Sequence, residues 1–251
     1  MSQSKMKYYE GHEGVYQKLA EAGADCWGRD DFENVYMLPY LKSALARTTL
    51  DEKEAVRALV VGCGTGPLAC ALSRRGYHVC GFDISSTAIV LARAQAEKRG
   101  LDIEYWVGDL CADDLGASCY DLIVDSHCMH CIVPDEDRGK ALKSICRALS
   151  PDGVFIIETM MRDPSIKGGV DVDEDGIHWT VFSGKERPDY ERARLRDGVW
   201  CVPQRRLRPN KEALDEELSR YGFQIRWSIE AESDEEGESG DYQAICTRRA
   251  P

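Results

Sequence analysis

A short apolar run that enters a glycine-rich turn constrains this chain more than any other feature. The apolar segment 59–61 precedes a loop with glycine at every second position, Gly62, Gly64 and Gly66, and Pro67 follows directly. Glycine lets the backbone approach a ligand closely and adopt turns that other residues avoid. Proline suits the first turn of a helix, where its missing N–H is not needed. The pattern predicts a strand, a ligand-binding loop and a helix in succession.

A second short strand, expected over residues 78–83, ends on Asp83. A carboxylate in this position can accept hydrogen bonds from both hydroxyls of a ribose. Dinucleotide-binding loops usually have the spacing G-x-G-x-x-G, whereas here glycine recurs at every second position. No Lys-Ser or Lys-Thr pair follows the loop, which argues against a phosphate-binding P-loop. The unit is therefore expected to hold a nucleoside-bearing cofactor.

Strands and helices alternate through the middle of the chain. Strands are expected at 56–61, 78–83, 103–107, 120–124 and 154–159, and helices at 67–75, 85–99 and 136–149, with a turn at 150–153. Such alternation requires right-handed crossovers and a mostly parallel sheet with helices on both faces. The ligand should lie beyond the carboxyl ends of the strands.

The alternation stops after the fifth strand and returns near the C-terminus. Residues 161–209 contain two short apolar patches, 177–181 and 199–202, which are candidate strands. A helix at 211–221 and a strand pair at 223–229 and 242–247 follow, and helices are expected within residues 7–50.

The charge distribution bears on the partners. The formal net charge is −12, which argues against nucleic-acid binding because such proteins gather Lys and Arg against phosphates. Residues 185–208 nevertheless carry eight basic and four acidic side chains. Arginine grips carboxylates and phosphates with a planar fork, so this segment favours an anionic acceptor. A solvated, salt-bridged surface is the alternative.

The cysteines and the lack of long apolar segments predict a compartment. The chain has eleven cysteines, several within expected strands and helices, which is typical of reduced core residues in the cytoplasm. Neither a signal peptide at the first residues nor an apolar run of membrane-spanning length is present, so no membrane partner is expected. Cys128 and Cys131 flank a histidine, but no second ligand pair of matching spacing supports a metal site.

In its glycine loop and the acid of its second strand, the chain resembles the class I S-adenosylmethionine-dependent methyltransferases. The resemblance covers roughly residues 55–160 and 210–248. It implies a Rossmann-like, seven-stranded, mostly parallel α/β sheet with helices on both faces and the last strand antiparallel. It also implies S-adenosylmethionine as cofactor and S-adenosylhomocysteine as product.

The same resemblance predicts four parts. They are an N-terminal helical lid (1–50), a cofactor-binding core (51–160), a substrate-binding insertion after the fifth strand (161–209), and a C-terminal helix and strand pair that complete the sheet (210–251). The lid and the insertion lie in regions that vary within the family, and they would select the acceptor.

The resemblance also assigns cofactor contacts. The backbone of the glycine loop would approach the amino-acid end and the ribose, and Asp83 would bind the ribose hydroxyls. Asp109 would accept from the adenine amino group, unless it is only a turn or cap residue. The full set of expected contacts is Tyr9, Trp27, Gly62, Cys63, Gly64, Asp83, Ile84, Gly108, Asp109, Leu110, Asp125, Ser126 and His127.

His127 is the candidate catalytic residue, because it follows the fourth strand and a histidine can remove a proton near neutral pH. The alternative is a histidine that only shapes the pocket, which is the role expected for His130. Acceptor contacts are expected at His12, Tyr16, His178, Trp179, Arg205 and Arg206. Aromatic residues of the lid, among them Tyr9 and Trp27, would cover the sulfonium, unless they belong to an ordinary amphipathic helix.

Two further segments, 8–16 and 125–131, look like those of stand-alone methyltransferases of natural-product pathways, some of which methylate the C-terminal carboxylate of ribosomally made peptides. The preferred interpretation is methyl transfer to such a carboxylate, with His127 orienting an acceptor that is already ionised. Three alternatives remain open. They are a small-molecule O- or N-methyltransferase with His127 as base, a nicotinamide-dependent oxidoreductase, and a protein that binds S-adenosylmethionine without turnover. The sequence does not indicate an oligomeric state.

Overall fold

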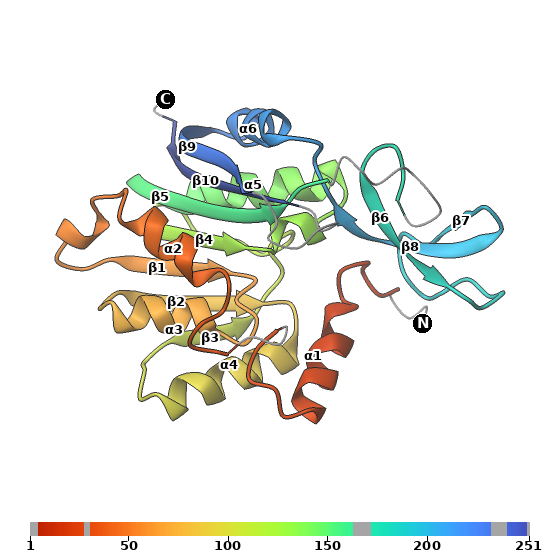
Figure 1. Cartoon of the computed structure of the whole chain (residues 1–251), viewed down its shortest axis with the longest axis horizontal. Helices are drawn as coiled ribbons and strands as arrows, with labels where there is room; N and C mark the ends of the chain where they lie inside the picture. The colour runs from red at the N-terminus through yellow and green to blue at the C-terminus, as the bar shows by residue number, and fades with distance from the viewer. Residues whose placement is uncertain (1–4, 28–30, 163–171, 232–239, 250–251) are drawn as a thin grey trace.

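A twisted seven-stranded sheet forms the centre of the molecule in the computed structural model, which describes residues 5–27, 31–162, 172–231 and 240–249 (Figure 1). The strand order is β3-β2-β1-β4-β5-β10-β9. The strands are β1 (Arg57–Val61), β2 (His78–Asp83), β3 (Glu104–Val107), β4 (Tyr120–Ser126), β5 (Leu149–Met160), β9 (Phe223–Ala231) and β10 (Asp241–Arg248). β10 runs antiparallel to both of its neighbours, and the first five strands are parallel. The predicted Rossmann-like sheet is confirmed, including its antiparallel last strand.

Helices cover both faces of this sheet and enclose two apolar cores. The helices are α1 (His12–Glu21), α2 (Leu38–Leu45), α3 (Pro67–Arg74), α4 (Ser86–Lys98), α5 (Asp135–Ala148) and α6 (Lys211–Arg220), with short 3-10 turns η1 (Leu50–Glu52) and η2 (Met129–Cys131). Side chains of α2, α3 and α4 form one core, and those of α5 and α6 form the other. Burial of apolar surface on both faces is the main stabilising contribution to such a layered fold. Within the described residues, no helix is both long and apolar enough to cross a bilayer.

Local sequence explains where these helices begin and end. Gly66 has a φ of 88°, and Pro67 opens α3. The Ser85 hydroxyl accepts the N–H of Ala88 and caps α4, an arrangement that stabilises a helix N-terminus. Gly76 and Gly100 adopt positive φ just beyond the ends of α3 and α4, as expected for left-handed terminating residues.

The N-terminal region is helical only in part. The helix expected near residue 8 begins at His12 and stops before Gly23, whose φ of 66° ends it. Residues 31–37 form turns, because the Asp31 carboxylate accepts the backbone N–H of Glu33 and offers the chain an alternative to helix. The turn expected at 150–153 is an irregular stretch of β5, where the pairing with β4 shifts register.

The insertion folds as a separate antiparallel sheet with the order β6-β8-β7. It contains β6 (Ile177–Phe182), β7 (Arg194–Arg196) and β8 (Val199–Arg206). The sequence indicated β6 and β8 but missed β7, whose three residues carry no apolar pattern.

The N-terminal segment packs against this small sheet, as the two adjoining segments in Figure 1 show. Met6 forms a bridge to Tyr190, and Tyr8 is buried with Val133, Ala193 and Val202. We call residues 5–27 and 172–208 the cap.

Candidate active site

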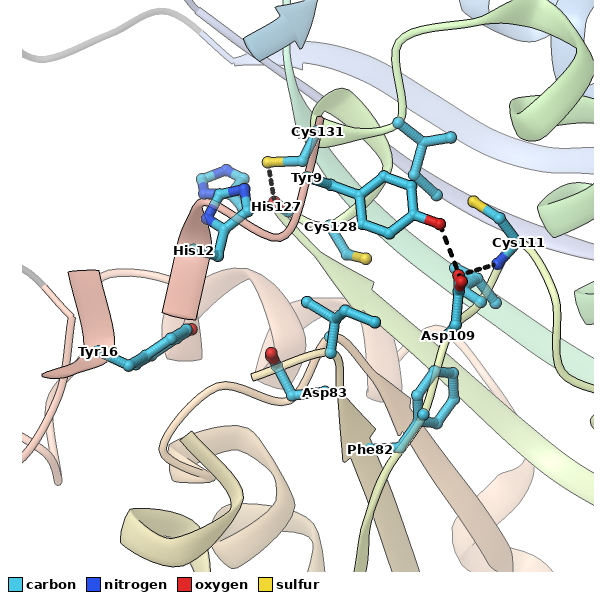
Figure 2. Close-up of a pocket in the computed structure, with 15 residues that line it drawn as sticks. Tyr9, His12, Tyr16, Phe82, Asp83, Asp109, Cys111, His127, Cys128 and Cys131 are labelled. Atoms are coloured by element: carbon cyan, nitrogen blue, oxygen red, sulfur yellow. Dashed lines mark hydrogen bonds between the residues drawn. The ribbon is translucent and has the colours of Figure 1, made fainter. Parts of the chain in front are cut away.

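A cavity of about 620 Å³ lies at the carboxyl ends of the central strands, beneath the N-terminal segment (Figure 2). The end of β2 contributes Asp83, the segment after β3 contributes Asp109, and the segment after β4 contributes His127. The full lining is Tyr9, His12, Tyr16, Gly62, Phe82, Asp83, Ile84, Gly108, Asp109, Leu110, Cys111, His127, Cys128, Cys131 and Ile132. This is the place where ligands bind in open parallel α/β sheets.

Two glycines of the loop are required by close contacts. A Cβ on Gly62 would lie 2.6 Å from the Cβ of Cys128, and a Cβ on Gly64 would lie 2.8 Å from the Tyr16 hydroxyl. Both residues also have positive φ, 58° and 54°, a conformation that glycine adopts without strain. The loop is therefore held between the segment after β4 and helix α1.

Asp83 is 6% exposed, and its carboxylate is fixed by the loop around it. One oxygen accepts the backbone N–H of Gly64 and the other that of Ser85, each at 2.9 Å. Burial raises the pKa of Asp83, and these N–H donors partly oppose that effect. The carboxylate that the resemblance assigns to the ribose hydroxyls is thus preorganised at the floor of the cavity.

The Asp109 carboxylate is held from both the cap and its own turn. Its Oδ2 accepts the Tyr9 hydroxyl at 2.8 Å and pairs closely with the Lys7 ammonium, while its Oδ1 accepts the N–H of Cys111 at 2.9 Å. Burial would raise the pKa of Asp109, but the bonds from Lys7 and Tyr9 outweigh it and lower that pKa. Asp109 therefore acts as a turn residue and also lines the cavity.

A second cavity of about 1150 Å³ continues from the first, since both are lined by His12, Tyr16, Gly62, His127 and Cys131. Its far side is built by residues from distant segments, among them Trp27, Tyr36, Met160 and Arg205. Cys63, Gly64 and Ser126 line this second cavity but not the first. The two cavities therefore adjoin one another at these five shared residues.

His127 stands at the junction of the two cavities. Its Nδ1 is in close hydrogen-bond contact with the Tyr36 hydroxyl, and its Nε2 lies 3.3 Å from Asp241 Oδ1 without forming a hydrogen bond. Burial, together with the nearby charge of Arg205, lowers the pKa of His127 to about 4. The ring is therefore neutral at physiological pH and is a weak base.

The neighbouring residues 128–131 have structural contacts. His130 is buried, and its Nδ1 accepts the N–H of Met160 at 3.4 Å. The Cys131 thiol points to the His127 carbonyl oxygen at 3.7 Å. Among the described residues, no group of three His, Cys, Asp or Glu side chains is placed to hold a metal ion.

Arg205 brings a positive charge into the second cavity. Its one hydrogen bond among the described residues goes to the Met160 thioether at 3.7 Å, and no carboxylate of those residues lies within ion-pair distance. The charge of Arg205 helps to lower the pKa of His12, His127 and His130, after the larger effect of burial on each. This guanidinium therefore lines the cavity without an acidic partner among the residues that the structure describes.

Four residues expected in the site lie outside both cavities. Arg206 faces Asp135 at 3.5 Å, and the buried Trp179 donates to Asp173 at 2.9 Å. His178 pairs with the backbone of β8 but does not line either cavity.

The fourth of these residues, Asp125, is fully buried below the site. It accepts the N–H groups of Cys128 and Met129, and burial raises its pKa to about 7. It thus supports the segment after β4 from beneath, without facing a ligand.

The sequence in turn missed residues that line or close the site. Tyr36 and Met160 line the second cavity, and Lys7 pairs with Asp109. Only Lys7 had a signal in the sequence, since it directly precedes the two aromatic residues of the expected lid.

Comparisons with known proteins agree with this geometry. Residues 58–153 match the family model of a methyltransferase domain. A ubiquinone biosynthesis O-methyltransferase of Aeromonas salmonicida is 30% identical over 43% of this chain and 44% of its own length. The chain spans about half the length of the curated relatives it matches.

Solved structures share the fold at low identity. The [4+2]-cyclase SpnF has a TM-score of 0.67 at 17% identity, with full coverage of both chains. A 1,6-didemethyltoxoflavin-N1-methyltransferase of Burkholderia thailandensis, solved with S-adenosylhomocysteine, has a TM-score of 0.64 at 16% identity and covers 95% of this chain and 88% of its own. In this chain the first cavity places a glycine loop with positive φ next to the buried carboxylate of Asp83. Residues 58–153 are accordingly similar in sequence to a methyltransferase domain, and the chain shares its fold with a solved methyltransferase.

Proposed function

We propose that this protein transfers the methyl group of S-adenosylmethionine to a carboxylate of its acceptor. The observation that carries the proposal is Arg205, a guanidinium in the second cavity with no carboxylate within ion-pair distance among the described residues. An arginine fork matches the two oxygens of a carboxylate. Since this cavity meets the first at His127 and Gly62, an acceptor bound by Arg205 would lie next to the cofactor.

The residues of the first cavity would hold the cofactor. Asp83 would bind the ribose, Asp109 the adenine amino group, and the loop at Gly62 and Gly64 the amino-acid end. The cofactor supplies a methyl carbon that its sulfonium already activates. The protein then contributes orientation and exclusion of water, and Tyr9, His12 and Tyr16 of the cap close the cavity from above.

The electrostatics of His127 support a carboxylate over a hydroxyl. A histidine with a pKa of about 4 is a poor general base for a phenol or an alcohol at neutral pH. A carboxylate is ionised at that pH and needs no base. In this proposal His127 orients the acceptor oxygen and excludes water, and Tyr36 fixes its ring.

The finer proposal is that the carboxylate is the C-terminus of a peptide natural product. Two exposed aromatic residues, Tyr36 at 52% and Trp27 at 42%, stand at the second cavity. Aromatic side chains of this kind pack against the apolar side chains of a larger acceptor. The excess of basic side chains in residues 185–208 favours the same acceptor, because the C-terminus of a peptide is an anion.

A small-molecule hydroxyl is the second candidate. The relatives named ubiquinone biosynthesis O-methyltransferases favour it, and so does the Tyr36 hydroxyl on Nδ1 of His127, because a phenolic acceptor could occupy the same position. In this alternative His127 acts as the base.

The test uses matched acceptors. The protein is incubated with S-adenosylmethionine and either free-acid or C-terminally amidated peptides, and phenols are supplied in a separate reaction. We expect a one-methyl gain only on the free acids, and mild alkali should release it as methanol because it is an ester. Methylation of phenols alone would support the second candidate. Tight S-adenosylhomocysteine binding without any transfer would indicate a binding protein, and thermal stabilisation by NAD alone would indicate an oxidoreductase.

A further inference from the structure

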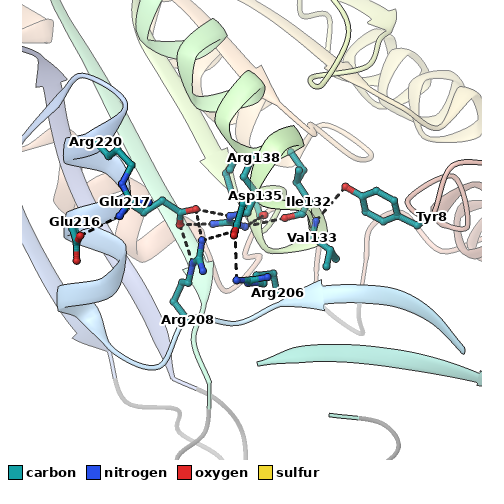
Figure 3. A network of polar contacts seen from close by, with 11 residues as sticks. Tyr8, Ile132, Val133, Asp135, Arg138, Arg206, Arg208, Glu216, Glu217 and Arg220 are labelled. Carbon is teal, nitrogen blue, oxygen red and sulfur yellow. Dashed lines mark hydrogen bonds and ion pairs between the residues drawn. The ribbon is translucent and has the colours of Figure 1, made fainter. Parts of the chain in front are cut away.

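A buried ion pair joins helices α5 and α6 (Figure 3). Arg138 of α5 donates from Nε to Glu217 Oε1 at 2.7 Å and from Nη2 to Oε2 at 2.8 Å. The residue Arg138 is only 2% exposed and Glu217 only 6%. A bidentate pair of this kind has strict geometry, so it fixes the guanidinium relative to α6.

The remaining nitrogen of Arg138 reaches the segment that follows β4. Its Nη1 donates to the carbonyl oxygen of Met129 at 2.6 Å and to that of Ile132 at 3.0 Å. These two carbonyls bracket the turn η2, which carries His130 and Cys131. The buried guanidinium therefore holds the turn just after His127 from behind.

Glu217 also pairs with a second cation, Arg208, which belongs to the cap. Arg208 lies just beyond β8 and approaches Glu217 with Nη2 at 2.7 Å from Oε1 and Nε at 3.3 Å from Oε2. The same Nη2 lies 3.1 Å from Asp135 of α5. Arg208 follows Arg205 by three residues, so the strand that carries the cavity guanidinium is anchored on the same carboxylate.

The two arginines strongly stabilise the ionised form of Glu217. Burial alone would raise the pKa of Glu217, but the hydrogen bonds and charges of Arg138 and Arg208 lower it to about 2. Removal of one partner from a buried pair leaves an uncompensated charge, whereas apolar residues could fill the same space without that cost. A network of two buried charged groups and the half-buried Arg208 is therefore poorly explained by stability alone.

We propose that Glu217 is a positioning residue that sets the spacing between His127 and Arg205. It does so through Arg138, which holds the turn after His127, and through Arg208, which anchors β8. We call these three residues the clamp. The inference rests on the proposed function in that Arg205 is taken to bind the acceptor. The cofactor groups Asp83 and Asp109 make no contact with the clamp among the described residues.

The test compares Glu217→Gln with Glu216→Gln, the neighbouring residue on α6 that pairs with Arg220 at the surface. For Glu217→Gln we expect kcat/KM for the acceptor to fall roughly tenfold, a size typical of directly coupled residues. The Kd for S-adenosylhomocysteine should change less than about twofold. Glu216→Gln should change neither. A lower Tm with unchanged acceptor kcat/KM well below that Tm would mean that the clamp is only structural.

Arg208→Lys provides a second variant, which keeps the charge and removes the guanidinium that contacts both Glu217 oxygens and Asp135. Hydrogen exchange is measured on the amides of Cys131 and Ile132, whose bonds to Cys128 and Met129 form η2. We expect this cap-side variant to accelerate exchange at both amides. If Arg208→Lys accelerates hydrogen exchange only at amides of β8, the inference is overturned, even if the enzyme methylates carboxylates. Accelerated exchange in a protein that methylates no carboxylate would leave the clamp standing and reject the proposed function.

Discussion

The two cavities are built in opposite ways from the chain. Most of the first comes from the ends of β1, β2 and β3, whose residues are close in sequence and whose registers are regular. The far side of the second comes from segments around residues 27, 36, 160 and 205. The cavity proposed for the cofactor is thus built from neighbouring segments of the sequence, and the cavity proposed for the acceptor depends on how distant segments pack together.

The polar groups of the two cavities differ as well. The carboxylates of the first cavity already accept hydrogen bonds from this chain, Asp83 from two backbone N–H groups and Asp109 from Tyr9, Lys7 and Cys111. The guanidinium of the second, Arg205, has only a thioether contact among the described residues. The first cavity is preorganised, whereas the second offers a charge without a counterion in the described part of the chain.

The strongest test of the first cavity is Asp83→Asn, which keeps the shape and removes the charge. We expect the Kd for S-adenosylhomocysteine to rise about 100-fold, because two hydrogen bonds from a ribose to a charged group are weakened. Isothermal titration calorimetry gives the value. Asp121→Asn is the matched control, since Asp121 also accepts a backbone N–H, that of Arg57, at the opposite end of the sheet. Affinity retained in Asp83→Asn would reject the ribose assignment.

The second cavity is tested by comparing Arg205→Gln with Arg206→Gln. Loss of Arg205 should raise the KM for a carboxylate acceptor roughly 10- to 100-fold, the range for a hydrogen bond to a charged group. Arg206→Gln should have little effect, because that side chain faces Asp135. Steady-state kinetics at saturating cofactor measure both. Equal effects of the two substitutions on KM would mean that Arg205 does not bind the acceptor carboxylate.

Arg205 and Arg206 also show a feature that the sequence could not predict, namely which of two adjacent side chains faces the cavity. Adjacent residues of a strand point to opposite faces, so only one of the two can face the cavity. Which one does so depends on the register of β8 with β6, and that register shifts between His178 and Trp179. No local pattern encodes this irregularity, and the sequence therefore favoured both arginines equally.

The core could be predicted because its signals are local. Positive-φ glycines, the capping Ser85 and the acid at the end of β2 each act within a few residues of their own position. Tyr36 and Met160 gave no such signal, since an exposed tyrosine and a strand-end methionine are ordinary residues until the tertiary fold brings them to His127 and Arg205. The same is true of Glu217, one of several acids on an amphipathic helix.

A smaller effect is expected where the cap meets the first cavity. Tyr9→Phe removes one of the bonds that hold the N-terminal segment against Asp109, so the Kd for S-adenosylhomocysteine should rise about threefold, within the range of a single hydrogen bond. Tyr77→Phe is the control, because the Tyr77 hydroxyl also bonds an aspartate, Asp51, far from the site. A tighter complex with Tyr9→Phe would mean that Tyr9 competes with the cofactor for Asp109.

The smallest expected effect is in the pH dependence, and it separates the two candidate functions. The pKa of His127 is about 4 in the folded protein, below its ordinary value of about 6.5. Between these values the unfolded chain binds a proton that the folded protein does not, so His127 lowers the stability as pH falls from about 6.5 towards 4. At pH 6 to 9 the folded ring stays neutral throughout.

For a carboxylate acceptor, kcat/KM should therefore show no slope that depends on His127 between pH 6 and 9, since neither the acceptor nor His127 titrates there. Any slope that Asp125, with its pKa of about 7, causes in this range should persist in His127→Gln. His127→Gln should lower the rate without changing the shape of that profile, because the residue orients the acceptor and removes no proton. A rate that rises with pH and a slope that disappears in His127→Gln would identify the histidine as a base. The second cavity would then be specialised for a hydroxyl, and Arg205 would bind an anionic group of the acceptor away from the atom that is methylated.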